Sequence, residues 1–372
     1  CPAGNTFAKA LDNRFDEHGL TYDPNGNLPT LKRNAHTTPA LPASPLIDDL
    51  AYSYYPHTNR LRRITDAAGS PMAGAWKDLA SQTGDNYAYD ALGQLREDAA
   101  GNVRLSYNVA GLVDTVWERS SGKLRLVVRY DEAGQRLCKI SFTAAGAEAK
   151  RTWYLMGMLY EQTAGAVAQR EIPIPGGVYY RAANQYYYSL TDHLGNVRAV
   201  LPRAAAAPLF FADYYPFGWR QPGRAHNDPL LNYRYGYQGQ EQDKETGWDA
   251  FELRMWDGRI GRWMSTDPKR QYHSPYIGMG NNPVNGVDPD GGEYIREYPD
   301  DYTGEMGPGD WKVNDRVTNS QRWQDANLYN LRLEASWEYT SIEQRRDVYT
   351  WFQRYTNSNG FKTRWAGAAA VV

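Results

Sequence analysis

The stretch that decides the fold is Tyr89-Asp90-Ala-Leu-Gly93-Gln-Leu95. An Asp or Asn that opens a turn accepts hydrogen bonds from backbone N–H groups just ahead of it, and a glycine three residues later supplies the positive φ that closes the turn. The tyrosine then ends one strand, and the aliphatic residue begins the next. This stretch therefore predicts a β-hairpin turn.

The same pattern recurs along the N-terminal part of the chain. Asp/Asn-x-x-Gly-x-Leu/Val occurs at Asp23-Gly26-Leu28, Asp90-Gly93-Leu95, Asp98-Gly101-Val103, Asn108-Gly111-Val113 and Asp192-Gly195-Val197, and with one extra residue at Asp131-Gly134-Leu137. A single match would be an ordinary turn, whereas this recurrence indicates a true repeat. Strand-turn-strand units at spacings of about 15–25 residues are expected to stack, because each hairpin needs its neighbours to bury a face.

The composition favours strands and excludes several classes of protein. The 372 residues include 29 Tyr, 12 Trp and 34 Gly, which is typical of strands joined by turns. A net charge of -2 predicts no overall attraction to nucleic acid or to an anionic membrane. Two cysteines, Cys1 and Cys138, exclude a disulfide-dense scaffold and a multi-cysteine zinc site. No apolar run is long enough to predict a membrane span.

The repeated Tyr-Asp-x-x-Gly units resemble the YD repeats of the bacterial Rhs family, which teneurins and the C subunits of insecticidal toxin complexes share. Asp192-His193-Leu-Gly195, Tyr214-Tyr-Pro-Phe-Gly218 and Tyr237-Gln-Gly-Gln-Glu-Gln-Asp-Lys-Glu-Thr-Gly247 resemble, in order, the segments that lead into the Rhs-associated core. Arg254 to Pro268 resembles that core itself. The resemblance implies a mainly β fold, in which YD-repeat hairpins spiral into a hollow cage around a C-terminal toxic domain and the core plugs one end.

This resemblance divides the chain into three parts. Residues 1–200 would form the YD-repeat β-shell, residues 201–292 the Rhs-associated core with its self-cleavage motif, and residues 293–372 the start of a C-terminal toxin or effector domain. Apolar residues at helical spacing between Arg322 and Trp337 predict a smaller, partly helical C-terminal segment. The chain lacks an initial Met and ends in an apolar run, so we expect a piece of a longer protein.

Two aspartates and one arginine in the core segment are candidate catalytic residues. Two carboxylates brought together share a proton and activate water. Gly258 and Gly261 would let a tight loop bring Asp257 and Asp267 together, and the planar fork of Arg254 could orient a carboxylate or a scissile carbonyl. Arg–Asp pairs in glycine-containing turns are more often structural ion pairs, so the spacing alone favours a structural role.

The resemblance favours a catalytic role for these residues over a structural one. In the toxin-complex relatives an Arg and two Asp at matching positions perform self-cleavage just after an Asp-Pro-x-Gly motif. It therefore implies Arg254, Asp257 and Asp267 as the catalytic set, with a cut between Gly292 and Glu293, after Asp288-Pro289-Asp290-Gly291. The family usually has a large apolar residue where this chain has Gly292. The implied reaction is peptide hydrolysis within one molecule, without a cofactor.

Other polar residues favour structural roles. His193 lies within a repeat turn and is expected to be a hydrogen-bonding turn residue. No cluster in the sequence supports a metal site. No histidine follows His273 and no cysteine follows Cys138, so the C-terminal part has no candidate for histidine-dependent nuclease or Cys–His chemistry.

The sequence thus favours a bacterial Rhs toxin carrier, secreted or at the cell surface and delivered by a secretion system. Its expected partners are the encapsulated C-terminal effector segment, the delivery machinery and an immunity protein, with no nucleic acid on the shell. One alternative is an adhesion or carbohydrate-binding surface protein with a structural core. Another keeps the shell but gives Asp257 and Asp267 purely structural roles.

Overall fold

Strands are the main regular structure of the described chain. The computed structural model describes residues 15–35, 46–68, 79–163, 165–203 and 207–296. Its strands confirm the mainly β fold that the repeat predicts. The helical segment expected near the C-terminus falls within residues 297–372, outside the described residues. No described helix is long and apolar enough to cross a membrane.

Two antiparallel sheets, in which each strand pairs with the next in sequence, form a wall. The first sheet consists of β1 (Glu17–Thr21), β2 (Thr30–Asn34), β3 (Leu46–Tyr54) and β4 (Leu61–Asp66). The second, 14-stranded sheet consists of β5 (Tyr87–Tyr89), β6 (Leu95–Asp98), β7 (Val103–Tyr107), β8 (Val113–Glu118), β9 (Leu124–Tyr130), β10 (Arg136–Phe142), β11 (Glu148–Leu155), β12 (Met158–Thr163), β13 (Ala166–Ile174), β14 (Gly177–Tyr180), β15 (Gln185–Thr191), β16 (Val197–Pro202), β17 (Phe210–Tyr214) and β18 (Arg220–Asn227).

The residues after β18, numbers 228–296, form the core segment. It holds a four-stranded sheet and a two-stranded sheet, formed by β19 (Glu241–Asp243), β20 (Trp248–Ala250), β21 (Met255–Asp257) and β22 (Arg262–Trp263), and by β23 (Gly286–Val287) and β24 (Ile295–Arg296). Short 3₁₀ turns occur at Arg181–Ala183, Tyr237–Gly239 and Met279–Asn281. The 14-stranded sheet continues to Asn227, past the predicted shell boundary at residue 200.

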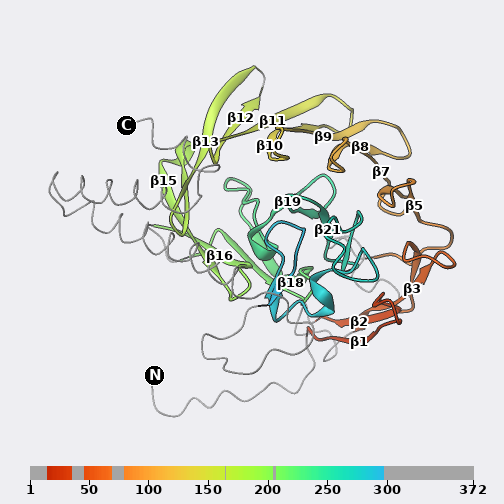
Figure 1. Ribbon diagram of the computed structural model, residues 1–372. Coiled ribbons are helices and arrows are strands. Elements are labelled where there is room, and N and C mark those ends of the chain that lie inside the picture. The colour runs from red at the N-terminus through yellow and green to blue at the C-terminus, as the bar shows by residue number, and fades with distance from the viewer. Residues whose placement is uncertain (1–14, 36–45, 69–78, 164, 204–206, 297–372) are drawn as a thin grey trace, which may run out of the picture.

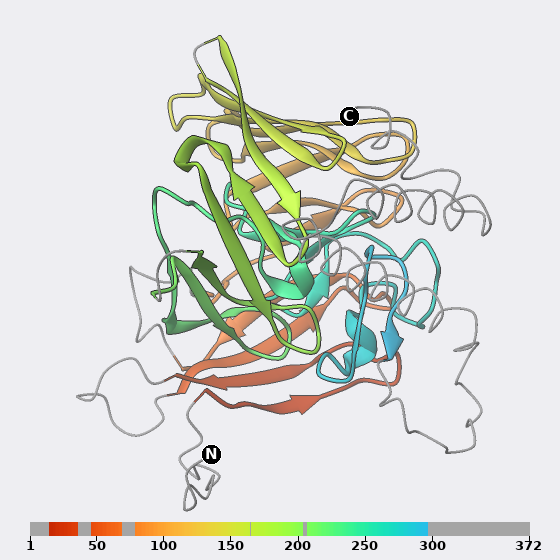
Figure 2. The same ribbon diagram turned by 90° about the vertical axis from the view of Figure 1, so that its left-hand side faces the viewer.

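The wall curves around the core segment. Figure 1 shows the strands from β1 to β16 following one another around β19 and β21. Figure 2, turned by 90°, shows the strands of the wall lying one above another with the core segment between them. Three tryptophans of the core segment, Trp248, Trp256 and Trp263, are at most 2% exposed and belong to the same hydrophobic cluster as the inner residues of the wall. The core segment therefore supplies much of the apolar surface against which the wall packs.

The repeat turns have the predicted geometry. In the turn that opens at Asp131, Oδ1 accepts hydrogen bonds from Ala133 N at 2.9 Å and Gln135 N at 2.8 Å. Gly134 has φ +81°, the left-handed conformation that the turn requires. The turns that open at Asp23, Asn108 and Asp192 repeat these two side-chain bonds. The unit at Asp98 differs, because the positive φ of its turn falls on Asn102 instead of Gly101.

Tyrosines at the ends of four wall strands tie neighbouring units together, which the sequence pattern did not reveal. Each tyrosine hydroxyl donates to the carbonyl of an aliphatic residue at or just before the start of an earlier strand. This bond occurs in the pairs Tyr54 to Leu28 (2.9 Å), Tyr107 to Leu95 (2.8 Å), Tyr130 to Val113 (2.6 Å) and Tyr214 to Val197 (3.0 Å). These bonds satisfy carbonyls that packing would otherwise leave without a partner, and they fix the spacing between stacked units.

Tips of the repeat turns contact the core segment. A Cβ added at Gly26 would lie 2.6 Å from Ile277 Cδ1, and one added at Gly93 would lie 2.8 Å from Thr266 Cγ2 and from the Tyr276 hydroxyl. Tyr276 also donates a 2.6 Å hydrogen bond to Gly93 O. The core segment thus covers the edge of the wall where these turns lie, as expected for a plug.

Replacing Tyr107 by Phe tests the tie between units. The substitution removes only the hydroxyl that binds Leu95 O, so we expect the free energy of unfolding to fall by about 0.5–1.5 kcal/mol. Tyr188→Phe is the matched control, because the Tyr188 ring lies exposed on the same wall. Urea unfolding of both variants measures the difference, and equal midpoints would contradict the proposed tie.

Candidate functional site

Arg254 is the centre of the candidate site. It lies at the end of the turn between β20 and β21, which a 3.1 Å bond from Phe251 N to Arg254 O closes. Its guanidinium lies 4.2 Å from the centroid of the Trp263 ring, and the residue is 5% exposed. A buried arginine must be surrounded by acceptors or negative charge, because removing its charge from water is costly. Its neighbours are therefore informative.

The Arg254 side chain joins the candidate aspartate to the predicted cleavage motif. Its Nε donates to Gly291 O. Its Nη2 lies 3.6 Å from Asp267 Oδ1 and 3.5 Å from Asp288 Oδ2, distances of ion pairs without close hydrogen bonds. Its Nη1 is buried and has no hydrogen-bond partner among the described residues. One arginine thus contacts two carboxylates and a carbonyl beside the predicted cut, and keeps one donor unused.

One oxygen of the Asp288 carboxylate accepts hydrogen bonds from three successive backbone nitrogens at the predicted cut. Its Oδ1 accepts from Gly291 N at 2.8 Å, Gly292 N at 3.0 Å and Glu293 N at 3.2 Å. Gly291 has φ +80°, and a Cβ there would lie 2.8 Å from Phe251 Cβ, so this turn needs glycine. Burial raises the pKa of Asp288 to about 6, although Arg254 opposes the rise. The carboxyl group beside the Gly292–Glu293 bond therefore holds a proton at mildly acidic pH.

Asp267 is held in place by the loop that follows it. Its Oδ1 accepts from Lys269 N at 2.9 Å, and its Oδ2 accepts from Gln271 N at 2.8 Å. The Gln271 side chain in turn accepts a 3.0 Å hydrogen bond from Tyr294 N, just beyond the predicted cut. The loop after β22 therefore contacts both the candidate carboxylate and the chain on the far side of the cut.

Asp257 has different partners from the other two predicted catalytic residues. Its Oδ2 accepts from Trp248 Nε1 at 2.8 Å and from Arg259 Nη2 at 2.6 Å, and its Oδ1 accepts from Arg259 N at 3.0 Å. It is 2% exposed. These contacts describe a structural ion pair that holds the β21–β22 turn. The structure thus brings Arg254 and Asp267 together with Asp288, which the sequence identified only as part of the cleavage motif.

Gly292 is buried against Leu253. A Cβ added at residue 292 would lie 2.7 Å from Leu253 Cδ1 and 3.1 Å from Asp290 Oδ1. Leu253 is anchored nearby by a 2.8 Å bond from its N–H to Asp290 O. The Leu253 side chain therefore fills the space that a large apolar residue at position 292 would need.

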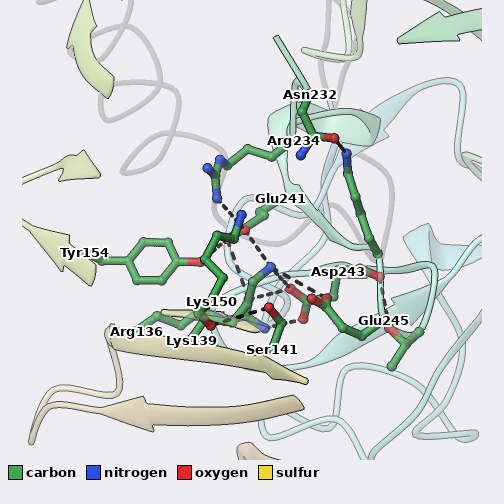
Figure 3. Close-up of polar contacts among 12 residues, drawn as sticks. Arg136, Lys139, Ser141, Lys150, Tyr154, Asn232, Arg234, Glu241, Asp243 and Glu245 are labelled. Atoms are coloured by element: carbon green, nitrogen blue, oxygen red, sulfur yellow. Dashed lines mark hydrogen bonds and ion pairs between the residues drawn. The ribbon is translucent and has the colours of Figure 1, made fainter. Parts of the chain in front are cut away.

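A buried ion network attaches the core segment to the wall, as Figure 3 shows. Asp243 on β19 is 0% exposed and receives both terminal nitrogens of Arg136 on β10, at 2.9 and 2.8 Å. Lys139 on the same strand donates to Asp243 Oδ1 at 2.9 Å. Burial alone would raise the pKa of Asp243, but the charges and hydrogen bonds of Arg136 and Lys139 outweigh burial and hold the pKa well below its usual range.

Glu241 provides the second attachment to the wall. Lys139 Nζ donates to its Oε1 at 2.9 Å, and the Tyr154 hydroxyl donates to its Oε2 at 2.7 Å. Arg234 of the core segment links Glu241 to the wall. Its Nη1 donates to Glu241 Oε1 at 3.4 Å, and its Nη2 donates to Glu171 Oε1 on β13 at 3.1 Å. All four carboxylate oxygens of Asp243 and Glu241 thus have donors, as buried charges require.

This ion network is connected to the candidate site by the pairing of neighbouring strands in the core sheet. Arg136 Nη2 also lies 3.7 Å from Met255 Sδ, and Met255 directly follows Arg254. In the core sheet, β19 pairs with β20 and β20 pairs with β21, where Ala250 lies opposite Met255. The attachment of β19 to the wall therefore also fixes the strand that begins beside Arg254.

Other candidate groups have structural surroundings. His193 Nε2 lies 3.1 Å from Val284 O, which confirms a hydrogen-bonding turn residue. Within the described ranges, no three His, Cys, Asp or Glu side chains are grouped so that they could hold a metal ion.

The sequence is similar to curated proteins of several kinds, although no protein-family model matches it. "Toxin subunit YenC2" of Yersinia entomophaga is 25% identical over an alignment of 432 residues, which covers 91% of this chain and 41% of that protein. "tRNA3(Ser)-specific nuclease WapA" of Bacillus spizizenii is 24% identical over 261 residues, 65% of this chain and 11% of that protein. "Salivary gland surface protein 1" of Aedes aegypti is 39% identical over 108 residues, 29% of this chain and 3% of that protein. The chain spans less than half the length of each of these relatives.

Two solved structures share the fold. The structure of the Photorhabdus luminescens Tc holotoxin pore with a mutation in TccC3 superimposes with a TM-score of 0.56 at 23% identity, covering 73% of this chain and 13% of that chain. The crystal structure of TcdB2-TccC3-Cdc42 gives a TM-score of 0.50 at 21% identity, covering 77% and 16%. At these identities the likeness shows a shared β-rich fold.

The contact between Gly292 and Leu253 predicts a compensating pair of substitutions. Gly292→Leu alone should overpack the site and lower the free energy of unfolding by about 1–3 kcal/mol. Gly292→Leu combined with Leu253→Ala should recover most of that loss, because the new side chain takes the vacated space. Urea unfolding of both variants, with Leu253→Ala alone as the control, checks this. An equally unstable double variant would show that Leu253 does not fill the space.

The ion network predicts a large cost for removing the charge of Asp243. Asp243→Asn leaves Arg136 and Lys139 buried beside an uncharged group, so the free energy of unfolding should fall by about 3–5 kcal/mol. Glu148→Gln is the control, because it removes a similarly short ion pair, with Arg151, that is in contact with solvent on the same wall. The control should unfold at the urea concentration of the unmodified chain. Similar midpoints for both variants would mean that the network does not hold the core segment in place.

Proposed function

Because the chain belongs to the Rhs/YD-repeat family, we propose that it is part of a toxin carrier whose shell encloses a C-terminal effector and whose core segment cuts its own chain between Gly292 and Glu293. The β-rich shell and the toxin relatives support the carrier. The division into a shell (1–200), a core (201–292) and the beginning of an effector (293–372) belongs to the same proposal.

One observation carries the proposed cleavage. Arg254 joins Asp267 and Asp288 beside a peptide bond whose nitrogen, Glu293 N, already donates to Asp288 Oδ1 at 3.2 Å. A proton donor thus lies beside the peptide bond that the cleavage motif identifies, and the proposed base, Asp267, contacts the same arginine. Structural ion pairs favour short, fully paired contacts, whereas both ion pairs of this arginine are long and its buried Nη1 is unused. That arrangement supports a catalytic role.

The proposed reaction is direct hydrolysis by water. The Asp267 carboxylate takes a proton from water as its oxygen attacks the Gly292 carbonyl carbon. The unused Nη1 of Arg254 donates to the carbonyl oxygen as it gains negative charge. The protonated Asp288 gives its proton to Glu293 N as the carbon–nitrogen bond breaks. The acid formed at Gly292 returns a proton to Asp288 and the proton on Asp267 passes to solvent, so the products are a carboxylate at Gly292 and an amine at Glu293, and no cofactor takes part.

Asp257 has a positioning role in this proposal. The resemblance assigns it to the catalytic set, but its carboxylate binds Trp248 and Arg259. It holds β21, the strand that begins directly after Arg254. We therefore expect Asp257→Asn to slow cleavage by loosening Arg254, while Asp288→Asn removes the proton donor itself.

The remaining parts of the proposal follow from the relatives. The names of the relatives include a toxin subunit and tRNA nucleases, which supports an effector as the cargo of this shell. We propose delivery to other cells by a bacterial secretion system, with an immunity protein protecting the producer. The shell itself has no proposed role in binding nucleic acid.

Substitution of the two proposed proton-transfer groups tests the mechanism. Asp288→Asn and Asp267→Asn keep the shape of each side chain but remove its proton transfer, so each should reduce the rate of cutting by at least about 100-fold. Asp290→Asn is the matched control, because its retained Oδ1 still accepts from Gly292 N. Intact mass spectrometry at fixed times after refolding gives the fraction cut. Normal cutting by Asp288→Asn would exclude it as the acid.

The raised pKa of Asp288 predicts the pH dependence of cutting. Asp288 donates a proton only when protonated, and its pKa is about 6, so the rate should fall as the pH rises above about 6. Refolding the denatured full chain in buffers from about pH 5 to about pH 8 and following the fraction cut gives this profile. A rate that increases steadily through this range would contradict the assignment of Asp288 as acid.

A further inference from the structure

The predicted cut lies in the loop of a β-hairpin, and the two paired strands hold the chain on both sides of the cut. β23 precedes the cut and β24 follows it, and the two pair antiparallel with Gly286 opposite Arg296 and Val287 opposite Ile295. Hydrolysis of the loop would leave this pairing intact. The chain end created by the cut therefore stays beside the groups that made it.

The residues just after the cut have further partners in the core segment. Tyr294 N donates to Gln271 Oε1 at 3.0 Å, and the Tyr294 hydroxyl donates to Asn282 O at 2.7 Å. A Cβ added at Gly280 would lie 3.4 Å from the Tyr294 ring, which shows how closely the ring fits. The loop after Asp267 and the turn at Asn282 thus both bind Tyr294, independently of the bond that is cut.

Cutting changes the charge at one atom of this site. Glu293 N is a neutral amide in the intact chain, 3.2 Å from Asp288 Oδ1. After hydrolysis it becomes an α-amino group, which is mostly protonated at neutral pH because its usual pKa is about 7.7–8.0. The new ammonium group has more donors than the amide and carries a full positive charge directly beside a buried carboxylate.

The surrounding charges favour that new cation. Asp267, Asp288 and Asp290 all act electrostatically on Arg254, which contacts both Asp267 and Asp288. The Glu293 side chain adds a further carboxyl group next to the cut. The carboxylates of Asp288 and Asp290 already accept hydrogen bonds from backbone nitrogens at the cut, so the cut adds a positive charge directly beside them.

We propose that the core segment contains a binding site for the α-ammonium end of the cut segment, formed by the Asp288 carboxylate, Gln271, the Asn282 carbonyl and the edge of β23. This inference rests on the proposed cleavage and adds what happens afterwards. The same carboxyl group that donates a proton to the leaving nitrogen then binds the product as an ion pair. The cut segment is thereby held at its first residues, apart from any confinement by the shell.

The experiment compares the reactivity of amines in the folded, cut protein. Formaldehyde with a mild reductant methylates neutral amines and is small enough to enter a shell, and peptide mass spectrometry reads the extent of labelling at each amine. Pairing with Asp288 raises the pKa of the Glu293 α-amine and shields it, so its labelling should be about tenfold slower per pKa unit than in urea-unfolded protein. Lys269, exposed two residues after Asp267, is the internal control and should label equally fast in both states.

A substitution distinguishes binding of the Glu293 α-amine at this site from simple burial inside the shell. Tyr294→Ala removes the hydroxyl bond to Asn282 O and the ring contact but leaves Asp267, Asp288 and Arg254 unchanged. In the fraction that is cut, its Glu293 α-amine should label several-fold faster than that of the unmodified chain. A cut chain whose α-amine labels as fast when folded as when unfolded would contradict the binding site alone. An intact chain with no Glu293 α-amine would instead contradict the proposed cleavage on which the site rests.

Discussion

The attachment of β19 to the wall is the interaction on which the interior of this molecule depends. Asp243 and Glu241 are buried carboxylates, and their donors come from strands that are far away in sequence. Burying such charges is costly unless every oxygen is paired, so this arrangement forms only when the wall and the core segment are both in place. Because β19 to β22 form one sheet, fixing β19 also fixes the strand beside Arg254. The chemistry of the candidate site is thus linked to completion of the shell.

The wall itself is built from many copies of one local turn motif. An Asp or Asn side chain and a left-handed glycine form the turns at Asp23, Asn108, Asp131 and Asp192, and tyrosine hydroxyls tie neighbouring units together. Turn tips then contact the core segment, as Gly93 contacts Thr266 and Tyr276. Local turns thereby create a curved sheet whose interior must be filled, and the tryptophans of the core segment fill it.

The local parts of this structure were predictable from the sequence, and the long-range parts were not. The turn at Asp131 follows from residues within its own turn, so the pattern predicts both its side-chain bonds and the φ of Gly134. The pairing of Arg136 with Asp243 joins residues 107 positions apart, and neither carries a motif that indicates the other. Arg254, Asp257 and Asp267 were predicted together from the resemblance, and the structure gives Asp257 different partners, Trp248 and Arg259. The proximity of Asp288 to Arg254 depends on the path of the chain after β23, which the sequence alone does not reveal. Proline follows Asp288 as it follows Asp267, and this shared Asp-Pro dipeptide was the sequence signal that pointed to Asp288.

Refolding in water enriched in oxygen-18 tests directly whether water cuts this chain between Gly292 and Glu293. We expect an N-terminal fragment that ends at Gly292 with one heavy oxygen in its new carboxylate, together with a C-terminal fragment that begins at Glu293. An intact chain would contradict it. So would fragments that begin at Pro268 or Pro289, because these come from spontaneous breakage of Asp-Pro bonds.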